Sequence, residues 1–251
     1  YLKFMDAQLT ELLTNYGPIG GIWFDGWWDK PDADWQLERQ YTLIHRLQPG
    51  CLIGNNHHKA PFEGEDFQMF ERDLPGQNKA GYSADAEISA LPLESCETMN
   101  NTWGYNINDR NFKSTKQLIH TLVGAAGNNA NLLLNVGPRP GGDFPEGSVR
   151  HLKEIGEWMR TYGETIQGTR AGIIPQQDWG VTTQKGNKLY IHILNLNKTE
   201  LLLPTTDRKI KSIVCFKDQT PVKYKKTKEG ILLQLNEVPT DIDHIVEIIW
   251  K

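Results

Sequence analysis

The sequence predicts an α/β protein in which parallel strand–helix units are followed by an all-β domain. Two observations favour this fold class. Apolar, strand-like runs alternate with helical segments up to about residue 170, and strand-like runs without helices follow. We therefore expect two domains, residues 1–170 and residues 171–251. The 251 residues are enough for both.

The expected elements of the first domain follow from apolar spacing and from stop signals. Apolar residues from Met5 to Tyr16 recur at helical spacing, and Gly17-Pro18 ends that helix. The short apolar run 19–24 is typical of a buried strand. The remaining expected elements are helix 34–48, strand 51–56, strand-like pieces 67–71 and 91–98, helix 114–126, strand 131–138 and helix 146–166, with Gly168 capping the last helix.

The second domain is expected to contain strands joined by turns. Lys228-Glu229-Gly230 is a predicted hairpin turn. The lysine-rich run 223–228 is expected to form a solvated strand face. The expected strands are 188–196, 209–216, the two arms of 221–235 around the turn, and 243–250.

Composition and motifs exclude several classes of function. The net charge of −4 lacks the excess of basic residues that is typical of nucleic-acid-binding proteins, so no nucleic-acid partner is expected. No apolar run is long enough to span a membrane, so no membrane partner is expected. The glycine-rich stretch before residue 131 precedes a strand and opens no helix, which argues against a nucleotide cofactor. His57 and His58 lie near acidic residues, but adjacent histidines on an extended segment face opposite ways. We expect no metal site and no cofactor.

Asp25 is the first candidate for chemistry, because it ends the apolar run 19–24 and is surrounded by tryptophans. Residues at the C-terminal ends of strands line the active sites of βα barrels. Tryptophan faces stack on sugars, so a tryptophan-rich carboxylate site favours a carbohydrate ligand. The alternative interpretation is that Asp25 caps a helix or pairs with a buried arginine.

A second carboxylate is available on the next strand-like pieces. Glu71 ends one of them, and Glu94 lies on the following one. Glycoside hydrolysis needs two carboxylates, one to attack or to activate water and one to protonate the leaving oxygen. Each glutamate could instead be an ordinary surface or ion-paired residue.

Three motifs in order, "YGPIGGIWFDG", "WGYN" and "NLLLNVGP", resemble the α-L-fucosidases of glycoside hydrolase family 29. The resemblance covers residues 1 to about 170. It implies a (β/α)8-like barrel followed by a C-terminal β-sandwich over 171–251, with about the last five βα units present. It also implies a retaining exo-α-L-fucosidase that releases terminal fucose from fucosylated glycans by double displacement, and a secreted or periplasmic protein.

The resemblance assigns roles to individual residues. Asp25 would be the nucleophile, and Trp23 and Trp103 would contact the sugar. His57 takes the place of the family's usual arginine, with His58 beside it. The acid/base is expected at Glu71, because its preceding strand and its distance from Asp25 fit better, with Glu94 as the alternative.

The resemblance also implies a missing part. Family members carry about three strands before the nucleophile strand, and these are not in this sequence. We therefore expect a fragment, or a second polypeptide that supplies the N-terminal barrel units, or a homo-oligomer. Two functional alternatives stay open: a fucose-binding or scaffold half-barrel without turnover, and a glycosidase for a related sugar.

Overall fold

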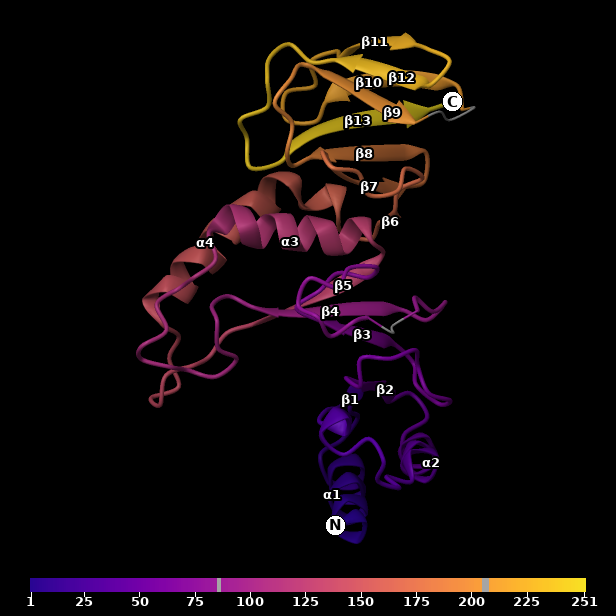
Figure 1. Cartoon of the computed structure of the whole chain (residues 1–251), viewed down its shortest axis with the longest axis vertical. Coiled ribbons are helices and arrows are strands. Elements are labelled where there is room, and N and C mark those ends of the chain that lie inside the picture. Colours follow the sequence, from indigo (N-terminus) through magenta and orange to yellow (C-terminus); the bar gives the residue numbers. More distant parts are fainter. Residues whose placement is uncertain (85–86, 205–207) are drawn as a thin grey trace. The chain divides into compact units, whose positions relative to one another are not determined.

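A computed structural model describes residues 1–84, 87–204 and 208–251, which form two units, Tyr1–Glu97 and Thr98–Lys251 (Figure 1). The first part of the chain is mixed α/β with parallel strands, and the later part consists of antiparallel sheets. No helix among the described residues combines the length and the apolar character needed to cross a membrane.

The described residues of the Tyr1–Glu97 unit form two α-helices, one 3-10 helix and four short strands. They are α1 (Leu2–Asn15), β1 (Gly21–Phe24), the 3-10 helix η1 (Trp27–Asp29), α2 (Leu37–Leu47), β2 (Leu52–Asn55), β3 (Gln68–Glu71) and β4 (Leu93–Thr98), whose last residue belongs to the second unit. Helix α2 starts later than the expected residue 34, because Gln36 adopts a left-handed conformation with φ 51°.

Parallel pairing brings the ends of these strands together. β1 pairs with β2 and β3 with β4, and a parallel bridge between Gly54 and Phe67 joins the two pairs. A Cβ on Gly54 would lie 2.2 Å from the Phe67 ring, so only glycine permits this approach. The C-terminal ends of β1, β2 and β3 therefore deliver residues to the same edge.

The expectation that residues 19–24 form a buried strand holds only in part. β1 forms, but Phe24 is its only buried residue, and the Trp23 side chain is 38% exposed. The reason is that β1 pairs on one side only among the described residues. Phe24 packs in a core with α1, α2 and Ile53 of β2.

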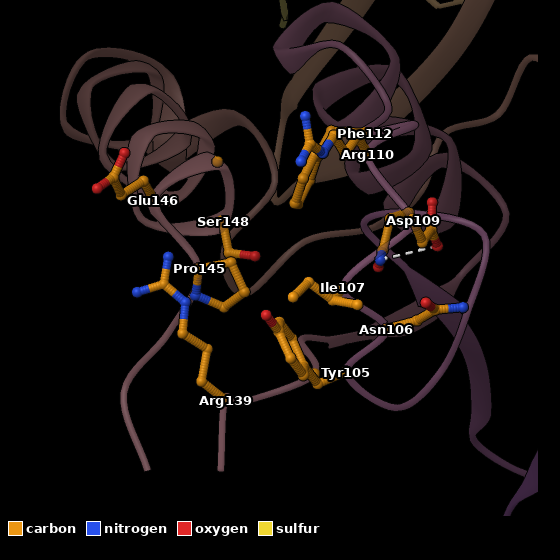
Figure 2. A pocket seen from close by; sticks show the side chains of 13 residues that line it. Tyr105, Asn106, Ile107, Asp109, Arg110, Phe112, Arg139, Pro145, Glu146 and Ser148 are labelled. Carbon is orange, nitrogen blue, oxygen red and sulfur yellow. Dashed lines mark hydrogen bonds between the residues drawn. The ribbon is translucent and has the colours of Figure 1, made fainter. Parts of the chain in front are cut away.

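Two helices and a strand open the second unit. They are α3 (Thr115–Gly127), β5 (Ala130–Asn135) and α4 (Glu146–Tyr162). Ser114 and Gln117 form a capping box at the start of α3. The first turn of α4 follows Pro145 and lies opposite Tyr105 (Figure 2). Helix α4 ends at Tyr162 rather than at the expected residue 166, because the chain tightens there into the 3-10 helix η2 (Gly163–Thr165).

Two antiparallel sheets follow. The five-stranded sheet has the order β10-β13-β8-β7-β6, and the three-stranded sheet has the order β11-β12-β9. Their strands are β6 (Arg170–Ala171), β7 (Gly180–Lys185), β8 (Lys188–Ile193), β9 (Glu200–Pro204), β10 (Ile210–Cys215), β11 (Lys223–Lys226), β12 (Gly230–Gln234) and β13 (His244–Trp250). The predicted hairpin between β11 and β12 is confirmed, and all four β11 residues are exposed, as expected.

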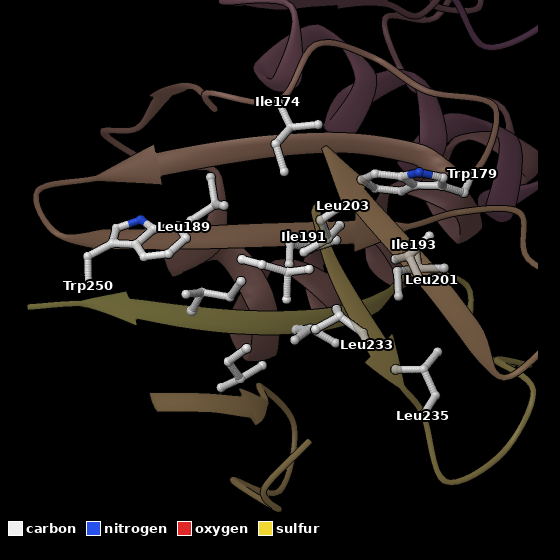
Figure 3. Close-up of a cluster of buried hydrophobic side chains, with 14 residues drawn as sticks. Ile174, Trp179, Leu189, Ile191, Ile193, Leu201, Leu203, Leu233, Leu235 and Trp250 are labelled. Carbon is white, nitrogen blue, oxygen red and sulfur yellow. The ribbon is translucent and has the colours of Figure 1, made fainter. Parts of the chain in front are cut away.

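Residues from both sheets form one hydrophobic core, shown in Figure 3 with Leu203 beside Ile191 and Leu201 beside Ile193. A separate core joins helices α3 and α4 to the five-stranded sheet. It contains Val123 of α3, Trp158 of α4 and Tyr190 of β8, all buried. Helices and antiparallel strands thus share packing within this unit, and a division into domains at residue 170 stays a prediction.

Candidate active site

Asp25 lies immediately after β1, where the chain turns through Gly26 with φ 82°. Its carboxylate is exposed, and its Oδ1 atom accepts a hydrogen bond from Asn56 Nδ2 at 3.2 Å. The register pairs Phe24 with Asn55, and the Asn56 backbone N–H donates to the Phe24 carbonyl at 2.9 Å. The strand pairing therefore places Asn56 beside Asp25. No arginine is involved in this contact.

The same Asn56 amide also reaches Glu71. Its Nδ2 atom donates to Glu71 Oε2 at 2.8 Å. The two carboxylate oxygens, on Asp25 and Glu71, therefore cannot lie farther apart than the sum of these two hydrogen-bond lengths. Retaining glycosidases hold their two carboxyl groups about 5–5.5 Å apart. The upper limit set by the two hydrogen bonds lies slightly above that separation, so Asn56 keeps the two carboxyls close together without fixing their distance.

His58 also contacts Glu71. Its Nε2 atom lies 3.2 Å from Glu71 Oε2, and its ring stacks on Tyr82 with centroids 5.2 Å apart. Hydrogen bonding from His58 is the main cause that holds the pKa of Glu71 below its ordinary value; burial opposes it, and Asn56 adds to it. Glu71 is therefore kept as an anion.

Glu94, on β4, has the opposite electrostatic environment. Burial raises the pKa of its carboxyl, and the hydrogen bond that Trp23 Nε1 donates to its Oε1 atom at 3.3 Å opposes this effect. Two residues further along β4, burial raises the pKa of the Cys96 thiol to about 12. The charges of Glu71, Glu94 and Asp25 add to that shift, so three carboxylates surround one buried thiol.

His57 does not face this group. Its side chain is 2% exposed, and its Nε2 atom lies 3.1 Å from both carboxylate oxygens of Glu65. Its Nδ1 atom accepts a hydrogen bond from the Lys59 backbone N–H at 3.1 Å, so Nε2 carries the proton that it donates to Glu65. Both ring nitrogens are engaged inside the protein, because the loop after β2 folds over the ring. In this structure His57 is not open to a sugar, contrary to the expectation from sequence.

Tyr41 completes the buried network around Glu65. Its hydroxyl donates to Glu65 Oε1 at 2.9 Å and accepts from Asn55 Nδ2 at 2.9 Å. Sequence reasoning did not find this role of Glu65, nor the role of Asn56. The signal was the pair Asn55-Asn56 directly after an apolar run, which places two amides at a strand end.

Trp103, expected at the sugar, belongs to the Thr98–Lys251 unit and is 36% exposed. Its backbone carbonyl accepts a hydrogen bond from Asn135 Nδ2 at 2.7 Å, and the same atom donates to Thr98 Oγ1 at 3.0 Å. Asn135 thus links the Trp103 backbone to Thr98, while the sugar contact of Trp103 stays a prediction. No group of His, Cys, Asp and Glu among the described residues could hold a metal ion.

The strand-end carboxylates and tryptophans are the features of a carbohydrate-active protein. Residues 1–164 match the family model described as "Alpha-L-fucosidase". The chain therefore belongs to the α-L-fucosidases, glycoside hydrolase family 29.

Known relatives are longer than this chain. Alpha-L-fucosidase 1 of Arabidopsis thaliana is 27% identical over 173 residues, which cover 62% of this chain and 34% of the relative. Human plasma alpha-L-fucosidase is 27% identical over 172 residues, which cover 64% of this chain and 34% of the relative. The chain thus spans about a third of the length of these curated relatives.

Solved structures share the fold. Alpha-L-fucosidase isoenzyme 1 from Paenibacillus thiaminolyticus superimposes with a TM-score of 0.80 and 32% identity, over 100% of this chain and 62% of that one. The Thermotoga maritima α-fucosidase superimposes with a TM-score of 0.76, over 99% of this chain and 56% of that one. Its 22% identity shows likeness of fold alone.

Proposed function

We propose that this chain carries the catalytic carboxylates of a retaining exo-α-L-fucosidase. The observation that carries this proposal is the gathering of three carboxylates: Asn56 donates to both Asp25 and Glu71, and Trp23, two residues before Asp25, donates to Glu94. Membership of the fucosidase family supplies the substrate class. The fold proposed for the complete enzyme is a (β/α)8-like barrel with a C-terminal β-sandwich.

In the proposed first step, an oxygen of Asp25 attacks the anomeric carbon of a terminal fucose. The bond from that carbon to the glycosidic oxygen breaks, and the departing oxygen takes a proton from Glu94. In the second step, Glu94 takes a proton from water, the water oxygen attacks the anomeric carbon, and Asp25 is released. A structure of the Bacteroides thetaiotaomicron enzyme is described as a trapped covalent intermediate, which supports this two-step course.

Glu94 is preferred to Glu71 as the acid on electrostatic grounds. A general acid must hold its proton near neutral pH, which favours a carboxyl whose pKa is raised. Burial raises the pKa of Glu94, whereas His58 lowers that of Glu71. This proposal reverses the preference drawn from the sequence. Glu71 is then the anion that fixes His58 and Asn56.

The sugar contacts are proposed accordingly. Trp23 and His58 are proposed to contact the sugar, and Trp103 keeps the contact that the family resemblance assigns to it. His57 is buried in the loop after β2 and supports that loop. A closed barrel needs further strands beside β1, because β1 pairs on one side only among the described residues. We propose that these strands come from a longer polypeptide, a second polypeptide or a second copy of this chain.

The test uses the chain together with whatever completes its barrel. Asp25→Gly should lower kcat on an aryl α-L-fucoside at least about a thousandfold, and azide should restore turnover and give a fucosyl azide of inverted configuration. Asp29→Asn, in the same turn and 66% exposed at its side chain, is the matched control. Near-native kcat in Asp25→Gly without azide would show that Asp25 is not the nucleophile.

The same assay separates the alternatives. A fucose-binding scaffold would bind fucose without releasing the aryl group. A glycosidase for a related sugar would prefer another member of a panel of aryl glycosides.

A further inference from the structure

A separate hollow lies within the Thr98–Lys251 unit, between the loop that follows Trp103 and the first turn of α4 (Figure 2). It encloses about 490 Å³, a size typical of small-molecule sites. Apolar surface comes from Tyr105, Ile107, Phe112 and Pro145.

Two glycines allow the walls of this hollow to meet. A Cβ on Gly147 would lie 2.9 Å from the Phe112 ring, and one on Gly137 would lie 2.6 Å from the Tyr105 backbone nitrogen. The first turn of α4 and the loop after Trp103 are therefore held close together at fixed points. These two close contacts fix the positions of the walls of the hollow.

The first turn of α4 offers hydrogen-bond donors to this hollow. Pro145 precedes the helix and provides no side-chain cap, and the backbone N–H groups of residues 146–148 have no acceptor among the described residues. In α3, by contrast, Ser114 accepts from the Gln117 backbone N–H. Free N–H groups and the helix dipole together favour an anion at such a terminus.

Ser148 gives an independent indication of a ligand. The residue is only 2% exposed, and its side chain points into the hollow beside Pro145 and Ile107 in Figure 2. Its hydroxyl has no hydrogen-bond partner within the described ranges 1–84, 87–204 and 208–251. Hydroxyls of residues this buried normally have a hydrogen-bond partner, so the Ser148 hydroxyl, which faces the hollow without one, offers a partner to a ligand atom there.

The charges of the lining also favour an anion. Arg110 lines the hollow and has no acidic partner in the part of the chain that is described. The acidic groups nearby are engaged or directed elsewhere. Asp109 accepts hydrogen bonds from the Asn101 and Thr102 backbone N–H groups at 2.9 Å, and Asp143 pairs with Arg139 at 2.8 Å. The exposed Glu146 side chain points away from Ser148 in Figure 2.

We propose that this hollow binds the acidic substituent, a carboxylate or a sulfate, of a saccharide. The anion would accept hydrogen bonds from the first turn of α4 and from Ser148, with Arg110 balancing its charge. The sugar ring would lie against Tyr105 and Ile107. The choice of a saccharide as the carrier rests on the proposed function, whereas the anion site rests on the donors alone.

The test is calorimetric titration of the chain with two acidic probes and one neutral one. The methyl α-glycoside of N-acetylneuraminic acid carries the carboxylate, galactose 6-sulfate carries the sulfate, and galactose is the neutral control. We expect at least one acidic probe to bind, and galactose to bind at least about tenfold more weakly. Which acidic probe binds identifies the preferred anion.

Two variants locate the binding. Ser148→Ala and Arg110→Gln should each weaken binding of the acidic probe by about fivefold or more. Arg160→Gln, at the other end of α4 and 73% exposed at its side chain, should leave it unchanged. Equal binding of galactose, full affinity in both variants, or no binding of either acidic probe would overturn the inference. Because the titration needs no hydrolysis, it stands whether or not fucosidase activity is found.

Discussion

The indole Nε1 atom of Trp23 donates a hydrogen bond to Oε1 of Glu94 at 3.3 Å, so the residue two positions before the proposed nucleophile contacts the proposed acid. This hydrogen bond stabilises the ionised form of Glu94 and opposes the effect of its burial on the pKa. Trp23 therefore has an electrostatic role in addition to its surface for a sugar.

Trp23→Phe should move the basic limb of the pH profile of kcat/KM to higher pH. Without the indole N–H, the pKa of Glu94 rises further, and the acid keeps its proton to higher pH. The profile should be measured with a fucoside that has a poor leaving group. Trp28→Phe, in the following turn and 53% exposed, serves as control. A limb that stays in place or moves to lower pH would contradict the assignment of Glu94.

Leaving-group dependence distinguishes the two glutamates. Glu94→Ala should lose at least about a hundredfold more kcat/KM on poor leaving groups than on activated aryl fucosides, because protonation matters less when the leaving group is already acidic. Glu71→Ala should show a milder loss of similar size on both. Steady-state kinetics over a series of phenols measures this, and the opposite pattern would return the acid/base role to Glu71.

Glu94 and Glu71 should change the free energy of unfolding in opposite directions as the pH rises. Glu94 has a raised pKa in the folded state, so the folded chain binds its proton more tightly, and stability falls as pH rises from the unfolded pKa through the folded pKa. Glu94→Gln removes that loss and should raise the free energy of unfolding at pH 7, with a smaller change at pH 4.

Glu71→Gln is the matched comparison. The folded pKa of Glu71 is lowered, so its stabilisation is present above the unfolded pKa and is lost as pH falls through the folded pKa. This variant should therefore have a lower free energy of unfolding than the wild type at pH 7, with a smaller difference at pH 4. Urea denaturation of both variants and the wild type at pH 4 and pH 7 measures these changes. Shifts of the same sign in the two variants would be inconsistent with the described environments.

The buried pair of His57 and Glu65 should be needed for stability. Glu65→Ala removes the acceptor of His57 Nε2 and of the Tyr41 hydroxyl, and should lower the free energy of unfolding by about 3 kcal/mol. Glu63→Ala, exposed in the same loop, should change it by less than about 0.5 kcal/mol. Thermal denaturation provides the measurement. Similar melting temperatures for both variants would show that the pair is dispensable.

The strand ends were the part of the site that the sequence predicted well. Asp25 and Glu71 each follow an apolar run, and such runs form strands because β-branched and aromatic residues pack on a pleated surface. The structure places both residues at strand ends and connects them through Asn56. The approximate positions of helices α3 and α4 were also predictable from apolar spacing.

Contacts that depend on register were not predictable. The direction of the His57 side chain depends on Glu65, eight residues later, and Glu65 is itself held by Tyr41 of α2. The choice between Glu71 and Glu94 depends on desolvation and on a hydrogen bond from Trp23, 71 residues away from Glu94 in the sequence. The spacing of residues along the chain predicts neither the desolvation of Glu94 nor this hydrogen bond, because both arise only when separate strands pair.

The core that α3 and α4 share with the five-stranded sheet bears on how such chains can be recombined. Val123 and Trp158 are covered by Tyr190 and Ile245, and a Cβ on Gly127 would lie 2.4 Å from Val181. A chimaera whose junction lies between α4 and the sheet would pack the helices of one parent against the sheet of another. The side chains of that core would then not fit one another. Segments exchanged between relatives should therefore give a folded chimaera when α3, α4 and the five-stranded sheet are all taken from the same parent.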